Sequence, residues 1–194
     1  MATLTAPAPP ARRPKPVRKF IRTWFLERTL RRVPKTRQIL DLGCGYGFYF
    51  SINPHARGVD GDPVAVEYLC QQGFDVQQAD FLQGLPYPDA EFEYVIAHDV
   101  LEHFRFDELE SLCSEVHRIL RPGGIFLVLV PNRKGYDYGL RTGAGHQLFV
   151  TRSEIERLCQ GCFGLRWQYP EPLPRWLGRF FTHNKEVFEL VKSV

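Results

Sequence analysis

The residues best suited to chemistry are three acids that recur along the first half of the chain. Asp41, Asp60 and Asp80 are separated by nineteen and twenty positions, and each follows a short apolar segment. A carboxylate at such a place can accept hydrogen bonds from the hydroxyls of a ribose, or it can pair with an ammonium group. The spacing therefore indicates one ligand-binding acid after each of three successive strands.

A glycine-rich segment follows Asp41 directly. The stretch QILDLGCGYGFYF, residues 38–50, places Gly43, Gly45 and Gly47 at alternate positions. Glycine lets the backbone turn tightly and approach a ligand closely. The third glycine comes one position too early for a dinucleotide-binding loop, and the Lys-Ser/Thr pair of a phosphate-binding loop is missing. Because a carboxylate repels a pyrophosphate, this loop favours a cationic or zwitterionic ligand, such as a sulfonium with an attached ammonium.

Apolar segments alternate with helical patterns from residue 37 onward, and these elements must position the acids and the glycines. We expect strands in residues 37–42, 56–60, 74–80, 92–100, 125–131, 165–170 and 186–194. We expect helices in residues 63–73, 106–120 and 151–160. Such alternation predicts parallel pairing with right-handed crossovers, and continuous apolar strands predict a sheet that is covered on both faces. Ligands of such sheets bind at the carboxyl ends of the strands.

Two helices carry sequence signals for their first residues. Asp107 is the expected N-cap of the long helix in the middle of the chain. Thr151, with Glu154 three residues later, predicts a capping box. Cys159 and Cys162 form one C-x-x-C, but they lack the second cysteine pair or the histidines that a zinc site needs. We therefore expect a helix end at these cysteines, and no metal site in the chain.

Four motifs follow one another in the order and spacing of a known family. They are ILDLGCGYGFY, GVDGDPVAVEYL, QADFLQGLPYPDAEFEYVIAHDVLEH and EVHRILRPGGIFLVLVPN, and they cover about residues 37–132. The motifs resemble those of class I S-adenosylmethionine-dependent methyltransferases. The likeness is greatest to the small-molecule branch with a methyltransferase type 11-like domain, which includes the ubiquinone-pathway enzymes. The resemblance implies an α/β fold: a Rossmann-like three-layer αβα sandwich whose seven-stranded sheet is mostly parallel, with an antiparallel last strand.

The resemblance also implies S-adenosylmethionine as cofactor, and it assigns the residues that contact each part of it. These residues are Asp41, Gly43, Cys44, Gly45 and Tyr46 at the methionine part, Asp60 at the ribose, Gly61 and Asp62 beside the adenine, Asp80 and Phe81 at the adenine edge, and Ala97, His98 and Asp99 beneath the sulfonium. One of these assignments has a structural alternative. Asp62 precedes a proline, so it can serve simply as a helix N-cap.

Methyl transfer from a sulfonium is an in-line displacement, which depends mainly on alignment and on the exclusion of water. A general base is needed only where the acceptor must first lose a proton. The candidates for a catalytic role are His98, His103 and His146. In the structural alternative, His103 and Glu102 support the start of the following helix. His146 lies in a glycine-rich segment that we interpret either as a lid over the acceptor or as ordinary loop packing.

The net charge of +3 conceals a basic segment followed by an acidic remainder. Residues 1–37 hold eleven Lys/Arg and one acid, whereas the rest of the chain holds fourteen Lys/Arg and twenty-one acids. The prolines of residues 1–16 predict a disordered Pro/Arg-rich arm. Apolar residues at helical spacing predict a basic amphipathic helix in residues 17–36. Residues 37–194 are left for the methyltransferase domain.

The basic residues at 12–32 leave three interpretations open. The helix packs its aromatic side on the domain, lies on an anionic membrane surface, or binds nucleic acid. We expect a cytoplasmic protein, either free or peripheral at a membrane surface. The sequence carries no signal for an oligomeric state.

The sequence predicts transfer of a methyl group to a small-molecule or lipid-linked acceptor. Residues 132–147 and 170–184 mix aromatic residues with arginine and are expected to shape the acceptor site. Two alternatives remain: a binding module that keeps the fold without turnover, and an RNA or protein methyltransferase that uses the basic arm for its partner. The segment AHDV, residues 97–100, differs from the Asn/Asp-Pro-Pro-aromatic tetrad of many nucleic-acid methyltransferases, which counts against methylation of a base amine.

Overall fold

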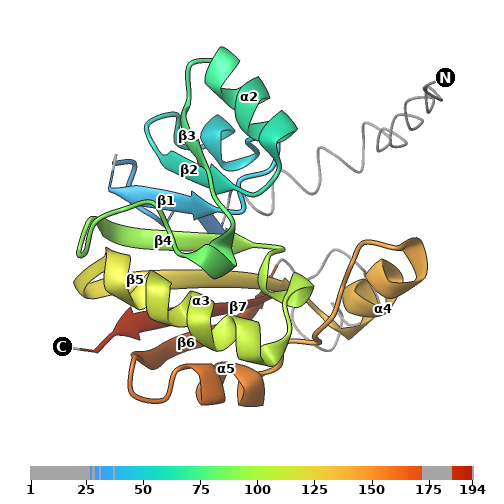
Figure 1. The fold of residues 1–194 in the computed structure, drawn as a ribbon. Coiled ribbons are helices and arrows are strands. Elements are labelled where there is room, and N and C mark those ends of the chain that lie inside the picture. Colours follow the sequence, from blue (N-terminus) through green and yellow to red (C-terminus); the bar gives the residue numbers. More distant parts are fainter. Residues whose placement is uncertain (1–26, 28, 31, 37, 172–184, 194) are drawn as a thin grey trace, which may run out of the picture.

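The computed structural model describes residues 27, 29–30, 32–36, 38–171 and 185–193. These residues form one seven-stranded sheet with helices on both faces (Figure 1). The strands are β1 (Ile39–Leu42), β2 (Arg57–Asp60), β3 (Asp75–Gln78), β4 (Phe92–His98), β5 (Leu120–Pro131), β6 (Phe163–Glu171) and β7 (Lys185–Lys192). Each of the seven expected strands is therefore present, with small differences at its ends.

The sheet has the strand order β3-β2-β1-β4-β5-β7-β6. β1 pairs in parallel with both β2 and β4, and β4 pairs in parallel with β5. β7 is antiparallel to both of its neighbours, β5 and β6. The predicted mostly parallel sheet with an antiparallel last strand is confirmed. Strand order reverses between β1 and β4, and this is where ligands of open parallel sheets bind.

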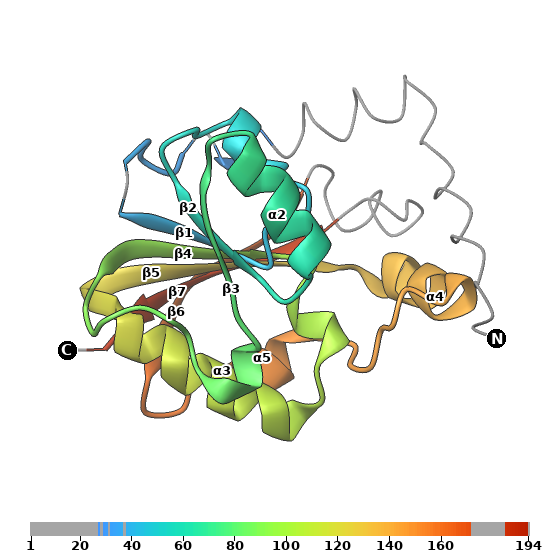
Figure 2. The same ribbon diagram turned by 45° about the horizontal axis from the view of Figure 1, so that its top comes forward.

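In the described part of the chain, four α-helices and three short 3-10 helices connect these strands. They are α2 (Pro63–Gln71), α3 (Phe106–Ile119), α4 (Arg133–Thr142), α5 (Arg152–Leu158), η1 (Tyr49–Ser51), η2 (Phe81–Gln83) and η3 (Leu101–His103). Figure 2 shows α2 on one side of the sheet and α3 with α5 on the other. The predicted three-layer arrangement is therefore confirmed.

Two apolar cores, one on each face of the sheet, hold these layers together. Successive side chains of a strand point to opposite faces, so Phe126 and Val128 of β5 join one core while Leu127 and Leu129 join the other. The first core contains the buried faces of α3 and α5, and the second contains Leu69 of α2. Burial on both faces explains why the central strands are apolar throughout.

One predicted helix start is confirmed and one is wrong. Thr151 forms the expected capping box with Glu154 at the start of α5. The N-cap of α3, however, is Arg105 and not Asp107. The backbone N–H of Arg105 donates to the Glu108 carboxylate at 2.8 Å, which starts the helix two residues earlier. Asp107 therefore lies in the first turn, where it pairs with the Arg105 guanidinium.

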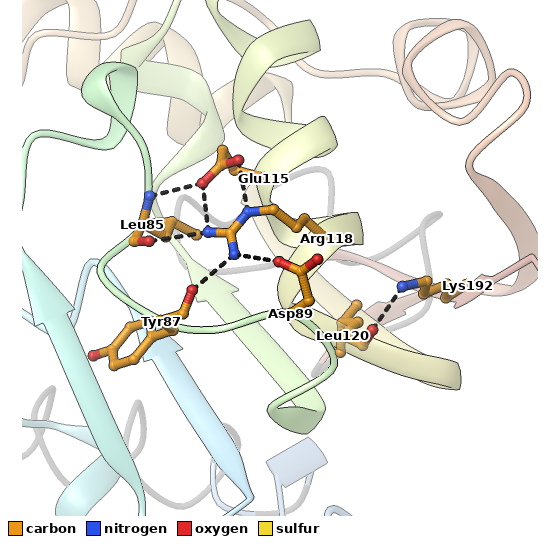
Figure 3. A network of polar contacts seen from close by, with 7 residues as sticks. All are labelled: Leu85, Tyr87, Asp89, Glu115, Arg118, Leu120 and Lys192. Carbon is orange, nitrogen blue, oxygen red and sulfur yellow. Dashed lines mark hydrogen bonds and ion pairs between the residues drawn. The ribbon is translucent and has the colours of Figure 1, made fainter.

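Arg118 of α3 fixes the segment that connects β3 to β4 (Figure 3). Its guanidinium donates to the carbonyl oxygens of Leu85 and Tyr87 at 3.0 and 2.8 Å. It also pairs with the carboxylates of Glu115 and Asp89, each at 2.8 Å, and Glu115 in turn accepts the N–H of Leu85 at 2.9 Å. This network ties the segment that follows η2 to the helix layer.

Helix α4 is an element that the sequence did not predict. The first part of the segment expected at 132–147 to shape the acceptor site is a helix whose N-cap, Asn132, accepts the N–H of Gly135 at 2.9 Å. The helix ends at Gly143, which adopts the left-handed conformation with φ 70°. α4 extends beyond the carboxyl end of β5, on the same side as η3 (Figures 1 and 2).

Most of the predicted arm and basic helix, including all of residues 1–16, lies outside the described residues, as does most of the second insert at 170–184. Glu27 and Leu30 belong to a helical turn, and Leu30 is only 1% exposed in the second core. This end of the segment packs on the domain. None of the helices in the described part of the chain has the length and apolar character of a membrane span.

Candidate active site

The glycine loop lies between β1 and η1, at the reversal of strand order. Gly43, Gly45 and Gly47 all have positive φ, at 72°, 48° and 81°, a region that strains other residues. A Cβ on Gly43 would lie 2.5 Å from Val100 Cγ2, and one on Gly47 would lie 2.5 Å from Leu69 Cδ2. A Cβ on Gly45 would meet none of the described atoms within 4 Å. The outer glycines thus permit close packing, and the middle one borders open space.

Asp60, at the end of β2, holds this loop in place. One of its carboxylate oxygens accepts the N–H of Gly45 at 2.7 Å, and the other accepts the N–H of Asp62 at 2.9 Å. Each carboxylate oxygen has two lone pairs, so both oxygens keep capacity for a further hydrogen bond. The structure therefore joins the expected ribose acid directly to the glycine loop, and Asp60 can bind a diol without releasing the loop.

Asp41, at the end of β1, is only 5% exposed. Burial, together with the smaller effect of the negative charge on the nearby Asp60, raises the pKa of its carboxyl to about 8. A ligand ammonium beside Asp41 would favour the ionised form, because an opposite charge stabilises a carboxylate. Asp41 therefore fits the cationic end of a zwitterion better than any neutral group.

Asp62 and Asp80, which follow β2 and β3, also have a structural role. Asp62 is the N-cap of α2 and accepts the N–H of Val64 at 2.9 Å. Asp80 is the N-cap of η2 and accepts the N–H of Leu82 at 3.0 Å. Both side chains are exposed. The Ala79 N–H donates to the carbonyl oxygen of Asp60 at 3.1 Å, which brings the end of β3 beside the end of β2. The cofactor contacts assigned to Asp62 and Asp80 stay predictions.

Four other assigned residues differ widely in exposure. The thiol of Cys44 lies in the second core, and burial raises its pKa well above the usual range, so only its backbone can reach a ligand. Tyr46 is 66% exposed and meets Tyr68 edge-on, with ring centroids 5.9 Å apart. Gly61 is exposed, whereas Phe81 is buried and stacks on Phe104 at 6.2 Å. The expected contact of Phe81 through its backbone amide stays a prediction.

The floor expected beneath the sulfonium is the carboxyl end of β4. Ala97 is fully buried, and the His98 ring lies 6.3 Å from the Phe48 ring of the glycine loop. Asp99 has φ 57°, an uncommon value for a residue other than glycine. Its N–H donates to the carbonyl oxygen of Leu129 at 2.9 Å. Such strain clusters at functional sites.

Asp99 has charged neighbours that sequence reasoning missed. Lys185, the first residue of β7, pairs with the Asp99 carboxylate, and His98 Nε2 lies 3.4 Å from the same group. Lys185 and Asp99 are 86 positions apart in the sequence, so no local pattern could reveal the pair. The antiparallel return of β7 places Lys185 next to Pro131, at the carboxyl end of β5.

His103 and His146 are brought together by the structure. Their ring centroids are 5.2 Å apart, and both side chains are half-buried. Beside them, Glu102 is 1% exposed. Burial and the negative charge of Asp99, opposed by the smaller effect of Lys185, together raise the pKa of the Glu102 carboxyl to about 8. Two of the three predicted catalytic histidines, His103 and His146, therefore lie side by side. The third, His98, lies apart from them at the carboxyl end of β4.

These observations agree with the cofactor that the sequence implies. Gly45 leaves open space that a side chain would fill, Asp60 keeps hydrogen-bonding capacity for a ribose, and Asp41 suits an ammonium. The strand order, and a glycine loop beside two acids where that order reverses, are the arrangement expected from the resemblance to class I methyltransferases.

Comparison with known proteins leads to the same class. Residues 40–128 match the model of the methyltransferase domain family. A probable S-adenosylmethionine-dependent methyltransferase of Mycolicibacterium smegmatis is 34% identical over 112 residues, which cover 55% of this chain and 42% of that protein. A probable tRNA methyltransferase 9B of Mus musculus is 33% identical over 110 residues, covering 50% of this chain and 24% of that protein.

Solved structures share the fold across most of the chain. A SAM-dependent methyltransferase from Archaeoglobus fulgidus superimposes with a TM-score of 0.65 at 18% identity, covering 87% of this chain and 93% of that one. The chain spans less than half the length of the curated relatives described above. The similarity to the ubiquinone-pathway branch stays a prediction.

Proposed function

We propose that this domain transfers a methyl group from S-adenosylmethionine to a small-molecule or lipid-linked acceptor. The observation that carries the proposal is the arrangement at the ends of β1 and β2, where Asp41 and Asp60 flank a glycine loop with open space at Gly45. A hydroxyl-bearing cation matches these groups better than an anionic nucleotide does. The family match and the S-adenosylmethionine-dependent relatives support the same conclusion.

The bound cofactor supplies a methyl group that its sulfonium makes reactive. The residues of the chain hold and orient the reactants. Asp41 binds the ammonium, Asp60 fixes the ribose, and Ala97 with His98 lies beneath the reacting centre. In-line transfer depends on this alignment, because binding has already removed the translational and rotational freedom that free reactants would lose in the transition state.

The acceptor is proposed to approach from the side of η3 and α4. A hydroxyl acceptor must lose its proton, and the imidazoles of His103 and His146 are the candidate bases on this side. His146 stacks on Tyr136 of α4, with ring centroids 5.4 Å apart. Tyr136 is buried and both histidines are half-buried, which supports a narrow acceptor over a wide one.

Calorimetry with S-adenosylmethionine tests the cofactor site. We expect Asp60→Asn to weaken binding about 30-fold, or about 2 kcal/mol, because charge-assisted hydrogen bonds to the ribose are lost. Asp75→Asn is the matched control, since Asp75 lies at the start of β3 and pairs with Arg57 at 3.4 Å. Equal affinity of Asp60→Asn and the unaltered protein would show that Asp60 does not bind the ribose.

Transfer of labelled methyl identifies the acceptor class. Small metabolites, extracted lipids and tRNA are offered separately, and we expect label in one of the first two. A second candidate function is RNA methylation, which the similarity to the probable tRNA methyltransferase 9B of Mus musculus favours. Label in tRNA would support this second candidate. Cofactor binding without label in any fraction would support the binding module.

We further propose a cytoplasmic location, with the basic residues at 12–32 attaching the protein to an anionic surface. Eleven basic residues against one acid in residues 1–37 support this proposal, because such a segment is attracted to anionic lipid.

A further inference from the structure

We propose that Glu102, His103 and His146 form a binding site for a divalent transition-metal cation. Each of these residues offers one ligand atom, and these atoms all lie within 4.8 Å of one another. Two imidazole nitrogens and one carboxylate oxygen form a donor set that suits zinc and its neighbours in the first transition row. The sequence did not reveal the site, because 43 positions separate His146 from His103.

The carboxylate of Glu102 gives an independent reason to expect a cation. Glu102 is 1% exposed, and neither of its carboxylate oxygens has a donor in hydrogen-bond geometry among the described residues, although the Asp99 carboxyl interacts with it. A buried polar group without a partner is costly. Such groups persist mainly where function requires them, and a bound cation would supply the missing interaction.

The Nδ1 atoms of both histidines lie beside backbone carbonyl oxygens. His103 Nδ1 lies 3.3 Å from the carbonyl oxygen of Gly145, and His146 Nδ1 lies 3.2 Å from that of Tyr136. A carbonyl oxygen only accepts, so each Nδ1 carries the proton and each Nε2 keeps its lone pair. A backbone carbonyl that fixes the tautomer in this way is the usual support of a histidine ligand.

The backbone also holds the two halves of the site against each other. The N–H of Gln147 donates to the carbonyl oxygen of Glu102 at 2.7 Å. The side-chain amide of Gln147 donates to the carbonyl oxygen of His103 at 2.6 Å. These bonds fix the segment that carries His146 beside η3. The three side chains are therefore positioned before any cation binds, which limits the entropy lost on binding.

Three protein ligands leave room in the coordination sphere of zinc for a water molecule or an acceptor group. This role rests on the proposed function, whereas binding itself does not. A cation lowers the pKa of a hydroxyl that it contacts. With a cation bound, His103 and His146 serve as ligands and not as bases, so the hydroxyl proton leaves to solvent. The acceptor oxygen then forms a bond to the methyl carbon. The electron pair of the broken carbon–sulfur bond stays on sulfur.

Titration of the full chain with zinc and with cobalt tests the site. We expect one equivalent of zinc to bind, and we expect His103→Ala and His146→Ala each to weaken binding at least tenfold. His55→Ala is the matched control, because His55 is exposed and lies before β2, away from the cluster. Equal zinc affinity of both site variants and the unaltered protein, or no binding at all, would overturn the proposal.

Cobalt distinguishes this site from the cysteines. Nitrogen and oxygen ligands give visible ligand-field bands, whereas a thiolate adds an intense charge-transfer band in the near ultraviolet. We expect the former spectrum, and we expect it to be unchanged in Cys162→Ser. A charge-transfer band that disappears in Cys162→Ser would assign the metal to Cys159 and Cys162 and contradict the proposal. Glu102→Gln, checked for folding by circular dichroism, should weaken cobalt binding and change the bands.

The test of metal binding can be separated from the test of methyl transfer. S-adenosylmethionine affinity is measured with and without a chelator, and we expect the two values to be equal. Methyl transfer, once an acceptor is known, should fall at least tenfold with the chelator and recover with zinc. If the protein binds zinc but the chelator leaves the rate of methyl transfer unchanged, the cation has only a structural role.

Discussion

At the scale of single residues, the buried carboxyl of Asp41 lowers the stability of the protein without a ligand. Its carboxyl has a pKa of about 8 in the fold, against 3.8 for an unperturbed aspartate. Below pH 3.8 both the folded and the unfolded chain hold the proton. Between these two values only the unfolded chain ionises, so stability falls as pH rises. Above pH 8 the folded chain must bury the charge, and the full cost is present.

Asp41→Asn should therefore stabilise the protein without its cofactor. The gain should be small near pH 4 and reach on the order of 5 kcal/mol at pH 8. Thermal unfolding of both proteins from pH 4 to pH 8 measures the difference. Asp62→Asn, a similar change at an exposed N-cap, is the control and should show no such trend. A constant difference across this range would mean that Asp41 is not held in its neutral form.

The same residue should make cofactor affinity depend on pH. A cationic ammonium favours ionised Asp41, so binding releases a proton and S-adenosylmethionine should bind more tightly as pH rises from 6 to 8. We expect a gain approaching tenfold per pH unit in calorimetry. Asp41→Asn should bind more weakly and lose this dependence. Proton release that is unchanged in Asp41→Asn would assign the effect to another group.

The residues that sequence could identify are those governed by local rules. Asp60 and Asp80 were predicted because an acid directly after a parallel strand points to the ligand edge. Lys185 was not predicted, since its pairing with Asp99 depends on the return of β7 beside β5. Glu102 was noted only as support for a helix, because its burial without a hydrogen-bond partner is a property of the packed structure.

At the scale of elements, α4 makes room for the His146 ring at Gly139, which has no side chain. A Cβ on Gly139 would lie 2.0 Å from His146 Cε1. Gly139→Ala should raise helix propensity by about 0.8 kcal/mol, yet it must displace the His146 ring. We expect an altered His146 signal in NMR and at least tenfold slower methyl transfer, with little loss of stability. Leu140→Ala, at the exposed neighbouring position, should change neither.

Arg118 controls a second element, the segment between η2 and β4. Its five donors contact two carboxylates and two carbonyl oxygens. Arg118→Met should reduce the free energy of unfolding by about 2 kcal/mol, because the Leu85 and Tyr87 carbonyls lose a charged donor. Urea unfolding measures the change. Arg118→Lys should recover little, since a single ammonium cannot reproduce the planar fork. Full recovery by lysine would reduce the network to a simple charge pair.

Sequence patterns identified most elements and missed α4 for a physical reason. Three glycines at positions 135, 139 and 143 indicate an irregular loop, because glycine disfavours a helix. In the structure, Gly139 admits His146 and Gly143 ends the helix in the left-handed conformation. Tertiary packing therefore compensates for weak local propensity. The strands were easier to predict, since burial on both faces leaves an apolar pattern that needs no knowledge of the partner strand.

At the scale of the whole molecule, charge is divided between a basic start and an acidic domain. Deleting residues 1–26 removes six Lys/Arg and no acid, so the net charge changes from +3 to −3. Leu30 and Val33, which are buried in the second core, stay in place. We expect the shortened chain to keep its thermal stability and its S-adenosylmethionine affinity.

The deletion should abolish binding to vesicles that contain anionic lipid, because each basic residue near such a surface contributes about 1 kcal/mol. Sedimentation with vesicles at low and high salt measures this effect, and the full chain should detach as salt screens the charges. Neutral vesicles are the control. Equal sedimentation of both chains would contradict a membrane role for the arm. Arm-dependent binding to tRNA, without binding to vesicles, would instead favour the RNA methyltransferase.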